Sequence, residues 1–344
     1  MKFDYAIGNP PYQGESQNNG RKPPVYHYFL EEAYKIADVA ELIHPARFLF
    51  DAGQTPKVWN RKMLDDTHFK VLYYEPDAAK VFQNTEIKGG VAITIRDIRK
   101  DYGATEVFTS HQELNGIIKK VIKKNGGDLF LDSIISSRGT YRTTELFAKD
   151  YPYASKRLGK GTGNMIASNF FEKLPECYVK DEPQTNRNEF LGIMARLNNS
   201  RTICYIKKAY VQTNEFIDGY NLASPKSNGN GIFGEILTST EILKPGIGAT
   251  DTFISIGSFK TVVEAENIQK YLKTKFFRAL LGVKKVTQDN PKSVWNMIPL
   301  QDFTSNSDIS WSASIHDIDQ QFYKKYGLSQ QEIDFIESHV KEME

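Results

Sequence analysis

The sequence predicts an α/β fold for its first hundred residues, followed by a mixed α+β region and a helical end. Apolar runs of strand length alternate with amphipathic helical stretches up to residue 97. Residues 128–258 then carry only short β-like runs among glycine, asparagine, serine and proline, and helical spacing of apolar residues returns after residue 260. We therefore expect three segments, 1–110, 111–303 and 304–344.

The first segment has the pattern of a parallel sheet with helices on its faces. The expected strands are 3–8, 41–44, 69–75 and 91–97, and the expected helices are 25–38 and 56–66. The strand at 3–8 is apolar and is expected to be buried. The last two strands are joined by a loop without a helical pattern, which favours an antiparallel pair. The segment thus resembles one half of a doubly wound sheet that ends in a reversed strand.

Later helices have clearer boundaries than the loops between them. Residues 112–124 predict a basic amphipathic helix, and residues 261–282 predict one long helix with Gly282 as its C-cap. Near the end of the chain, Ser329 and Glu332 have the spacing of a capping box. Helices therefore frame a loop-rich middle, and long surface loops of this kind often carry recognition.

The charges are distributed unevenly although the net charge is only +2. Residues 260–292 hold eight lysines or arginines against three acids, whereas residues 302–344 hold nine acids against three lysines. A basic segment suits a phosphate backbone, but it is also typical of a solvated helix face.

Several classes of protein are disfavoured by the composition. No apolar run reaches the roughly 18 residues of a membrane span, and no signal-peptide pattern opens the chain, so we expect no membrane and a cytoplasmic location. Cys177 and Cys204 lack CxxC spacing, and the six histidines form no HExxH motif, so no metal site is predicted.

The stretch FDYAIGNPPYQG, residues 3–14, places a rigid bend directly after the first strand. Two prolines fix their φ angles and push Asn9 into an extended conformation. The bend lies at the carboxyl end of a parallel strand, where open α/β sheets bind ligands. The Asn9 amide and the proline carbonyls are acceptors, and Tyr12 adds a flat ring. This combination suits a planar ligand with an NH2 group, although a plain surface turn remains the alternative.

Adenine N6 is such a group. Its lone pair is conjugated into the ring, which makes the nitrogen a poor nucleophile. Two acceptors on its hydrogens would stabilise the positive charge that develops during methyl transfer, without a strong base.

The bend Asn9-Pro10-Pro11-Tyr12 resembles the NPPY catalytic motif of N6-adenine-specific DNA methyltransferases of the gamma-class-like restriction–modification kind. Further resemblance extends over most of the chain, in residues 24–33, 41–50, 81–95 and 258–303. The last of these is similar to the end of a target-recognition domain in large enzymes that join methyltransferase and specificity regions.

This resemblance implies a partial Rossmann-like methyltransferase sheet in residues 1–110, a target-recognition domain in 111–303 and a helical tail in 304–344. Its substrate would be adenine N6 in double-stranded DNA. Asn9 and the Pro10 carbonyl would hold N6, while Tyr12 and Phe82 would sandwich the base after it leaves the duplex. Phe82 could equally be a core residue.

The resemblance also implies S-adenosylmethionine as the methyl donor, with Tyr26 and Phe29 at its border; as helix-face aromatics, both could instead belong to the core. The glycine-rich loop and acid of the donor site precede NPPY in this class, yet only eight residues precede Asn9. We therefore expect a second polypeptide, or an N-terminal extension, to supply the other half of the sheet. The first strand would then be an apolar edge.

Basic residues in the recognition segment are the candidates for DNA contact. They are Arg138, Arg142, Lys284, Lys285 and Lys292. We expect them to contact phosphates and position the duplex, and the alternative is that each is a solvated surface charge.

Three alternative functions remain open at this stage. NPPY also occurs in methyltransferases that modify a glutamine amide of release factors or guanine N2 in ribosomal RNA. Pro76-Asp77 and Glu86-Ile87-Lys88 mimic a metal-dependent nuclease pattern, at a spacing common by chance. The chain could also be a non-catalytic DNA-binding or specificity subunit that needs a partner chain for donor binding.

Overall fold

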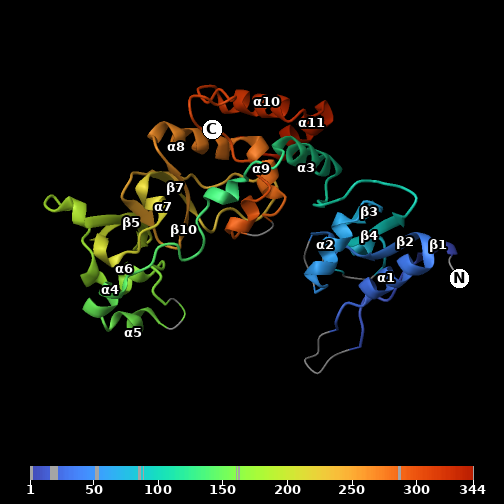
Figure 1. Ribbon diagram of the computed structural model, residues 1–344, viewed down its shortest axis with the longest axis horizontal. Helices are drawn as coiled ribbons and strands as arrows, with labels where there is room; N and C mark the ends of the chain where they lie inside the picture. Colours follow the sequence, from blue (N-terminus) through green and yellow to red (C-terminus); the bar gives the residue numbers. More distant parts are fainter. Residues whose placement is uncertain are drawn as a thin grey trace. The chain divides into compact units, whose positions relative to one another are not determined.

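The computed structural model describes residues 3–15, 22–50, 54–83, 87, 89–159, 161, 163–285 and 288–343, and for Gln112 only the backbone. The chain forms two compact units, unit 1 (Met1–Asn115) and unit 2 (Gly116–Glu344) (Figure 1). The first boundary predicted from the sequence lies close to this division.

Unit 1 is built around an open mixed sheet with strand order β1-β2-β4-β3. Its strands are β1 (Phe3–Gly8), β2 (Ala37–Pro45), β3 (Phe69–Glu75) and β4 (Val91–Asp97), and its complete helices are α1 (Tyr26–Ile36) and α2 (Lys57–Asp65). β1 and β2 are parallel, and β4 runs antiparallel to both β2 and β3. The reversed last strand is confirmed, and it inserts between β2 and β3.

The junction between α1 and β2 differs from the sequence prediction. The helix was expected to continue to residue 38, but it ends at Ile36, and β2 begins at Ala37 without a loop. The backbone N–H of Ala37 still donates to the Ala33 carbonyl, while its own dihedral angles are already extended. Burial of Ala37 and Val39 in the sheet outweighs the local preference for helix.

One apolar core fixes both helices on a single face of this sheet. It is formed by Tyr26 and Leu30 from α1, Trp59, Met63 and Leu64 from α2, Leu42, Phe69 and Ala92 from the strands, and Ala46, Phe48, Leu49 and Phe108 from connecting segments. At about 1.5–3 kcal/mol for each large buried side chain, these contacts hold α1 and α2 against strands β2, β3 and β4.

The exposure of β1 corrects the expectation that this strand is buried. Phe3, Tyr5 and Ile7 alternate along β1, so they share one face, and they are 51%, 62% and 78% exposed. β1 is also the outermost strand, paired with β2 only. In the described part of unit 1, this strand is therefore an apolar edge.

Unit 2 has an α+β architecture with two three-stranded sheets, ordered β10-β7-β8 and β6-β5-β9. The strands are β5 (Phe190–Leu197), β6 (Ser200–Lys207), β7 (Tyr220–Pro225), β8 (Glu241–Leu243), β9 (Ile247–Ala249) and β10 (Phe253–Phe259). The helices are α3 (Gln112–Asn125), which begins in unit 1, α4 (Glu145–Asp150), α5 (Ala154–Leu158), α6 (Phe170–Lys173), α7 (Glu215–Asp218), α8 (Val262–Lys273), α9 (Lys275–Gly282), α10 (Ile315–Lys325) and α11 (Gln330–His339). The mixed character predicted for residues 128–258 is observed.

The long helix predicted over residues 261–282 is two helices, α8 and α9, separated at Thr274. The Thr274 hydroxyl donates to the Tyr271 carbonyl at 2.7 Å and accepts the Phe277 N–H at 3.1 Å. The threonine therefore ends one helix and caps the next, a competition with helix geometry that apolar spacing alone does not reveal.

Residues 304–344, expected as a separate helical tail, pack within unit 2. The Asp319 carboxylate of α10 accepts the backbone N–H groups of Lys275 and Phe276 at 2.9 and 2.8 Å, which caps the start of α9. The predicted capping box of Ser329 and Glu332 is present at the start of α11. Among the described helices, none is long and apolar enough to cross a membrane.

Candidate active site

The Asn9–Tyr12 bend directly follows β1, at the carboxyl end of its parallel pair with β2. Its far end is tied to the segment before α1, because the Val25 N–H donates to the Tyr12 carbonyl at 3.1 Å and the Gly14 N–H donates to the Pro23 carbonyl at 2.9 Å. The sheet therefore fixes one end of the bend and the entry to α1 fixes the other.

The acceptors of the bend are not used internally. Asn9 is exposed, and its side-chain amide has no hydrogen-bond partner among the described residues. The Pro10 and Pro11 carbonyls likewise accept no hydrogen bond there. Oxygen acceptors held on a rigid backbone and open to a ligand are the arrangement that recognition of an NH2 group requires.

Tyr12 and Phe82, predicted to flank the base, lie next to each other. Their ring centroids are 6.3 Å apart with an interplanar angle of 67°, an edge-to-face contact. A base between two parallel rings needs about 7 Å, or two van der Waals contacts of about 3.5 Å. The two rings are therefore in direct contact. One of them has to move before a base can lie between them.

Tyr12 brings a buried polar atom to this contact. Its hydroxyl oxygen is buried without a hydrogen-bond partner in the described structure, and burial raises the pKa of Tyr12 to about 12. The phenol is thus neutral at physiological pH, and its hydroxyl has no partner among the described residues. On the other side of the contact, the Phe82 N–H donates to the Ala78 carbonyl at 2.8 Å, which continues the short 3-10 turn Ala78–Lys80.

The two aromatic residues predicted to border the donor have different environments. Tyr26 is only 3% exposed, and its ring is stacked on His44 with centroids 5.9 Å apart and edge-on to Trp59. Tyr26 therefore belongs to the core, because the surrounding rings already occupy its faces. Phe29 is 46% exposed and lines a hollow beside the bend.

That hollow is open and has a volume of about 860 Å³. Pro11, Gly14, Val25, Tyr28 and Phe29 make its mainly apolar wall, with Glu15 and Lys22 at its polar part. Ligand sites commonly have volumes of about 300–1,000 Å³ and apolar walls. Phe29 thus stays a candidate for ligand contact, on the side of Pro11 rather than beside Phe82.

Two buried histidines of unit 1 escaped sequence reasoning, because an isolated histidine in an aromatic segment carries no motif. Both ring nitrogens of His27 are buried without a partner in the described structure, and burial lowers its pKa. His44 is fully buried, and burial lowers its pKa to about 4. Its Nδ1 lies 3.1 Å from the Pro45 carbonyl, which can only accept, so Nε2 accepts from the Thr94 hydroxyl at 2.8 Å.

The nuclease alternative gains no support from the described residues. The Asp77 carboxylate accepts the Ala79 N–H and so caps the short turn after β3. Glu86 and Lys88 lie outside the described residues. No group of three or more metal-ligating side chains occurs in the part of the chain that the structure describes.

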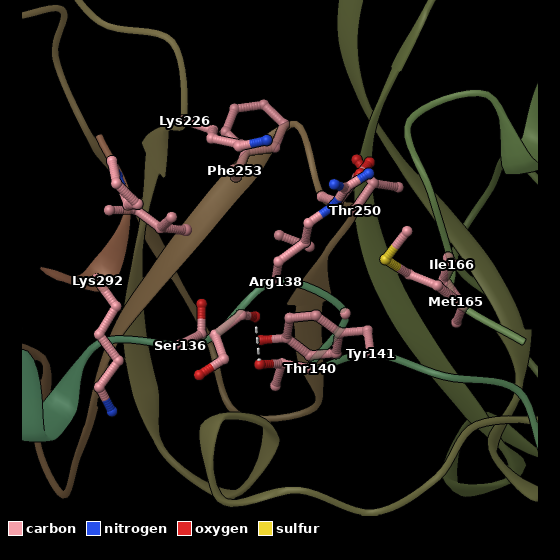
Figure 2. A pocket seen from close by; sticks show the side chains of 16 residues that line it. Ser136, Arg138, Thr140, Tyr141, Met165, Ile166, Lys226, Thr250, Phe253 and Lys292 are labelled. Atoms are coloured by element: carbon pink, nitrogen blue, oxygen red, sulfur yellow. Dashed lines mark hydrogen bonds and ion pairs between the residues drawn. The ribbon is translucent and has the colours of Figure 1, made fainter. Parts of the chain in front are cut away.

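The five predicted DNA-binding residues separate into distinct environments in unit 2. Arg138 and Lys292 line one pocket, shown in Figure 2, although they are far apart in sequence. Arg142 lies near Gly139 of this pocket, and it donates to the Asn164 side chain at 2.9 Å. Lys284 is exposed at the end of α9.

Lys285 is corrected by the structure. Its side chain is 3% exposed and forms an ion pair with Glu235 at 2.8 Å. The Glu235 carboxylate also accepts the backbone N–H groups of Asn230 and Gly231. Lys285 is therefore a structural residue that fixes the 229–235 loop, and it is not available to DNA. The burial of Lys285 could not be predicted from the sequence, because Lys284 and Lys285 are lysines at adjacent positions.

Comparisons with known proteins relate the candidate site to one family. Residues 1–82 match the model of the Eco57I restriction-modification methylase family. This range includes the Asn9–Tyr12 bend, helices α1 and α2, and Phe82 as its last residue. No curated protein matches the sequence.

Two solved structures give weak matches over almost the whole chain. The type IIG restriction endonuclease BpuSI has 10% identity and a TM-score of 0.32 over 98% of this chain and 54% of its own. The type IIL restriction-modification enzyme MmeI, in complex with DNA, has 10% identity and a TM-score of 0.35 over 97% and 56%. The chain thus spans about half the length of these structures. The family match over residues 1–82 supports a restriction–modification methylase as the class of this segment.

Proposed function

We propose that this chain carries the catalytic bend and the recognition region of a site-specific DNA methyltransferase of a restriction–modification system. Its reaction would be methyl transfer from S-adenosylmethionine to adenine N6 in double-stranded DNA. The observation that carries the proposal is the set of unused acceptors at Asn9 and Pro10, held at the carboxyl end of β1 inside the segment that matches a methylase family. Tyr12 and Phe82, side by side, support it.

Each residue has a defined part in this proposal. The Asn9 side-chain oxygen and the Pro10 carbonyl accept the two N6 hydrogens and stabilise the positive charge that grows on nitrogen. Tyr12 and Phe82 stack on the two faces of the extrahelical base, each contributing about 1–3 kcal/mol. The neutral Tyr12 hydroxyl adds no charge to the site, consistent with its raised pKa.

The described residues fit the methyl donor only in part. Phe29, Tyr28 and Pro11 offer an apolar wall beside the bend. The described part of unit 1 shows no glycine-rich strand–loop–helix with an acidic residue that would hold the rest of the donor. When bound, S-adenosylmethionine supplies an electrophilic methyl group on sulfonium, and the chain's own contribution is to hold the accepting nitrogen.

The remaining donor contacts are proposed to come from a second polypeptide segment that pairs with β1. The edge position of β1 leaves backbone hydrogen-bonding groups unpaired, and Tyr5 and Ile7 expose apolar surface beside them. A strand added along β1 would satisfy those groups, and an apolar element on the same face would cover both side chains.

Methylation assays test the proposal directly. The full chain is incubated with S-adenosylmethionine and mixed-sequence double-stranded DNA, alone and with the polypeptide encoded beside it, and the DNA is digested for nucleoside mass spectrometry. N6-methyladenine is the expected product. Asn9→Ala is expected to lower kcat by about 10²–10³ through loss of one charge-stabilising acceptor, with DNA affinity nearly unchanged.

Two results would contradict parts of this proposal. DNA binding without methyl transfer in every combination would favour the non-catalytic specificity subunit, and methylation of release factor or ribosomal RNA alone would favour the other NPPY enzymes. Calorimetry tests the partner separately: tight binding of S-adenosylmethionine by the isolated chain would show that no second segment is needed.

A further inference from the structure

The pocket that contains Arg138 and Lys292 gathers positive charge from three separate segments of unit 2. Arg138 comes from the turn between Ser137 and Thr140, Lys226 directly follows β7, and Lys292 follows Pro291 (Figure 2). Arg138 and Lys292 are predicted from the sequence to contact DNA, whereas Lys226 carries no local motif that would predict it. The fold places Arg138, Lys226 and Lys292 at one pocket, and this placement is independent of the charge pattern along the chain.

Arg138 and Lys226 stand on fixed backbone. The Thr140 N–H and hydroxyl both donate to the Ser137 carbonyl, at 3.3 and 2.7 Å, which closes the turn that presents Arg138. Just before this turn, Ser136 exchanges hydrogen bonds of 2.9 and 2.8 Å with Ser255 of β10. The Lys226 N–H donates to the Thr252 carbonyl, and its carbonyl accepts the Asn290 N–H, both at 2.9 Å. The backbone that carries both cations is therefore held in place before any ligand arrives.

The charges at the pocket do not cancel. Asp251 is its one lining carboxylate; it lies 4.0 Å from the Arg138 Nε and accepts the Ser168 N–H at 2.6 Å. Three lining cations and one lining carboxylate leave a surplus of two positive charges. The Arg138 side chain is 69% exposed, so it can turn toward a ligand without losing a buried ion pair. In Figure 2 the charged ends of Arg138 and Lys226 lie in the upper half of the view, while the Lys292 ammonium points away from them.

The size of the pocket decides between a base and a phosphate as the ligand. Its volume is about 70 Å³, less than half of the roughly 150 Å³ of a protein cavity that accepts a benzene ring. A purine or pyrimidine is larger than benzene, so the pocket is too small to enclose it. A phosphate group is compact, carries charge and needs several donors, which the two cations and the Ser137 hydroxyl among the lining residues provide.

We propose that this pocket binds a backbone phosphate of double-stranded DNA, held between Arg138 and Lys226, with Lys292 contacting the strand further along. The inference rests on the proposed action on DNA and adds a site to it. The contact reads no base, so its role is to fix the register of unit 2 on the duplex. Arginine suits this role because its planar guanidinium can donate two parallel hydrogen bonds to one phosphate.

The test measures DNA binding by the full chain. Fluorescence anisotropy reports binding to several unrelated duplexes over a range of salt concentrations. Arg138→Ala and Lys226→Ala are each expected to weaken binding about ten-fold on every duplex. Each is also expected to reduce the slope of log affinity against log salt by roughly one. Arg138→Lys keeps the charge and should retain part of the affinity. Lys324→Ala, at an exposed lysine of α10, is the matched control and should leave affinity and slope unchanged.

The possible results distinguish the phosphate pocket from the proposed methyltransferase function. Normal affinity and slope in the Arg138→Ala/Lys226→Ala double variant would overturn the pocket while leaving the methyltransferase proposal intact. Weakening confined to one DNA sequence would overturn the phosphate assignment, because it would indicate base reading. Failure of the unaltered chain to bind any duplex would overturn both proposals. Unchanged melting temperatures of the variants would exclude misfolding as the cause of lost affinity.

Discussion

His44 gives the sharpest prediction for unit 1, because its protonation is incompatible with its place in the core. The ring is fully buried, stacked on Tyr26, and hydrogen-bonded through Nδ1 to the Pro45 carbonyl and through Nε2 to the Thr94 hydroxyl. Burial lowers its pKa to about 4. In the unfolded chain, the pKa of histidine is about 6.5.

The direction and size of the effect follow from linkage. The unfolded state binds the proton more readily, so the stabilising contribution is complete above pH 6.5 and is lost as the pH falls toward 4. A difference of about 2.5 pKa units corresponds to about 3 kcal/mol in total, of which about 2 kcal/mol is lost between pH 8 and pH 5. That loss is a large share of an ordinary domain stability of about 5–15 kcal/mol.

Two measurements check this reasoning. Nuclear magnetic resonance should show the His44 ring still neutral at pH 5. Hydrogen exchange of β2 and β4 peptides in urea should show unit 1 losing about 2 kcal/mol between pH 8 and pH 5. In His44→Gln, whose amide can accept from Thr94 without titrating, most of this pH dependence should vanish. A measured His44 pKa near 6.5, or the same pH dependence in His44→Gln, would refute the account.

Two further predictions concern residues whose roles the structure separates. Lys285→Ala should destabilise unit 2 by about 3 kcal/mol, because it leaves the Glu235 carboxylate buried without its cation. The matched change at exposed Lys284 should cost under about 0.5 kcal/mol, and urea unfolding distinguishes them. Phe82→Ala should lower kcat/KM for methyl transfer by about 10–100-fold through loss of one base stack, whereas Phe82→Tyr should retain most of the rate. A normal rate in Phe82→Ala would remove Phe82 from the base site.

The sequence was most informative where local chemistry and long-range packing agree. The rigid bend after β1 followed from Pro10 and Pro11, whose effect on the backbone does not depend on the rest of the fold. The reversed direction of β4 followed from the short connection from β3. The insertion of β4 between β2 and β3 did not follow, because strand order depends on pairing energies between distant segments.

The role of a side chain could not be predicted from the sequence where burial decides that role. Tyr26 and Phe29 are neighbours on α1, yet one is core and the other lines the hollow, because the helix turns only one of them toward Trp59 and His44. Lys226 lacked any motif and became visible only when the fold brought it near Arg138. Such assignments depend on the three-dimensional arrangement and are not encoded in residue type.

In the proposed methyl-transfer reaction, the contact between Tyr12 and Phe82 would allow one site to be closed at rest and still accept a base. Their edge-to-face contact is worth about 0.5–1.5 kcal/mol, whereas stacking on a base is worth about 1–3 kcal/mol for each ring. Replacing one ring contact by two base stacks therefore releases free energy, which offsets part of the few kcal/mol needed to extrude a base from the duplex. The centroids are 6.3 Å apart at an interplanar angle of 67°, so one ring would have to rotate toward parallel and move apart to create the required gap of about 7 Å. Both residues are half-buried, but Tyr12 also carries a buried hydroxyl, so Phe82 is the ring expected to rotate.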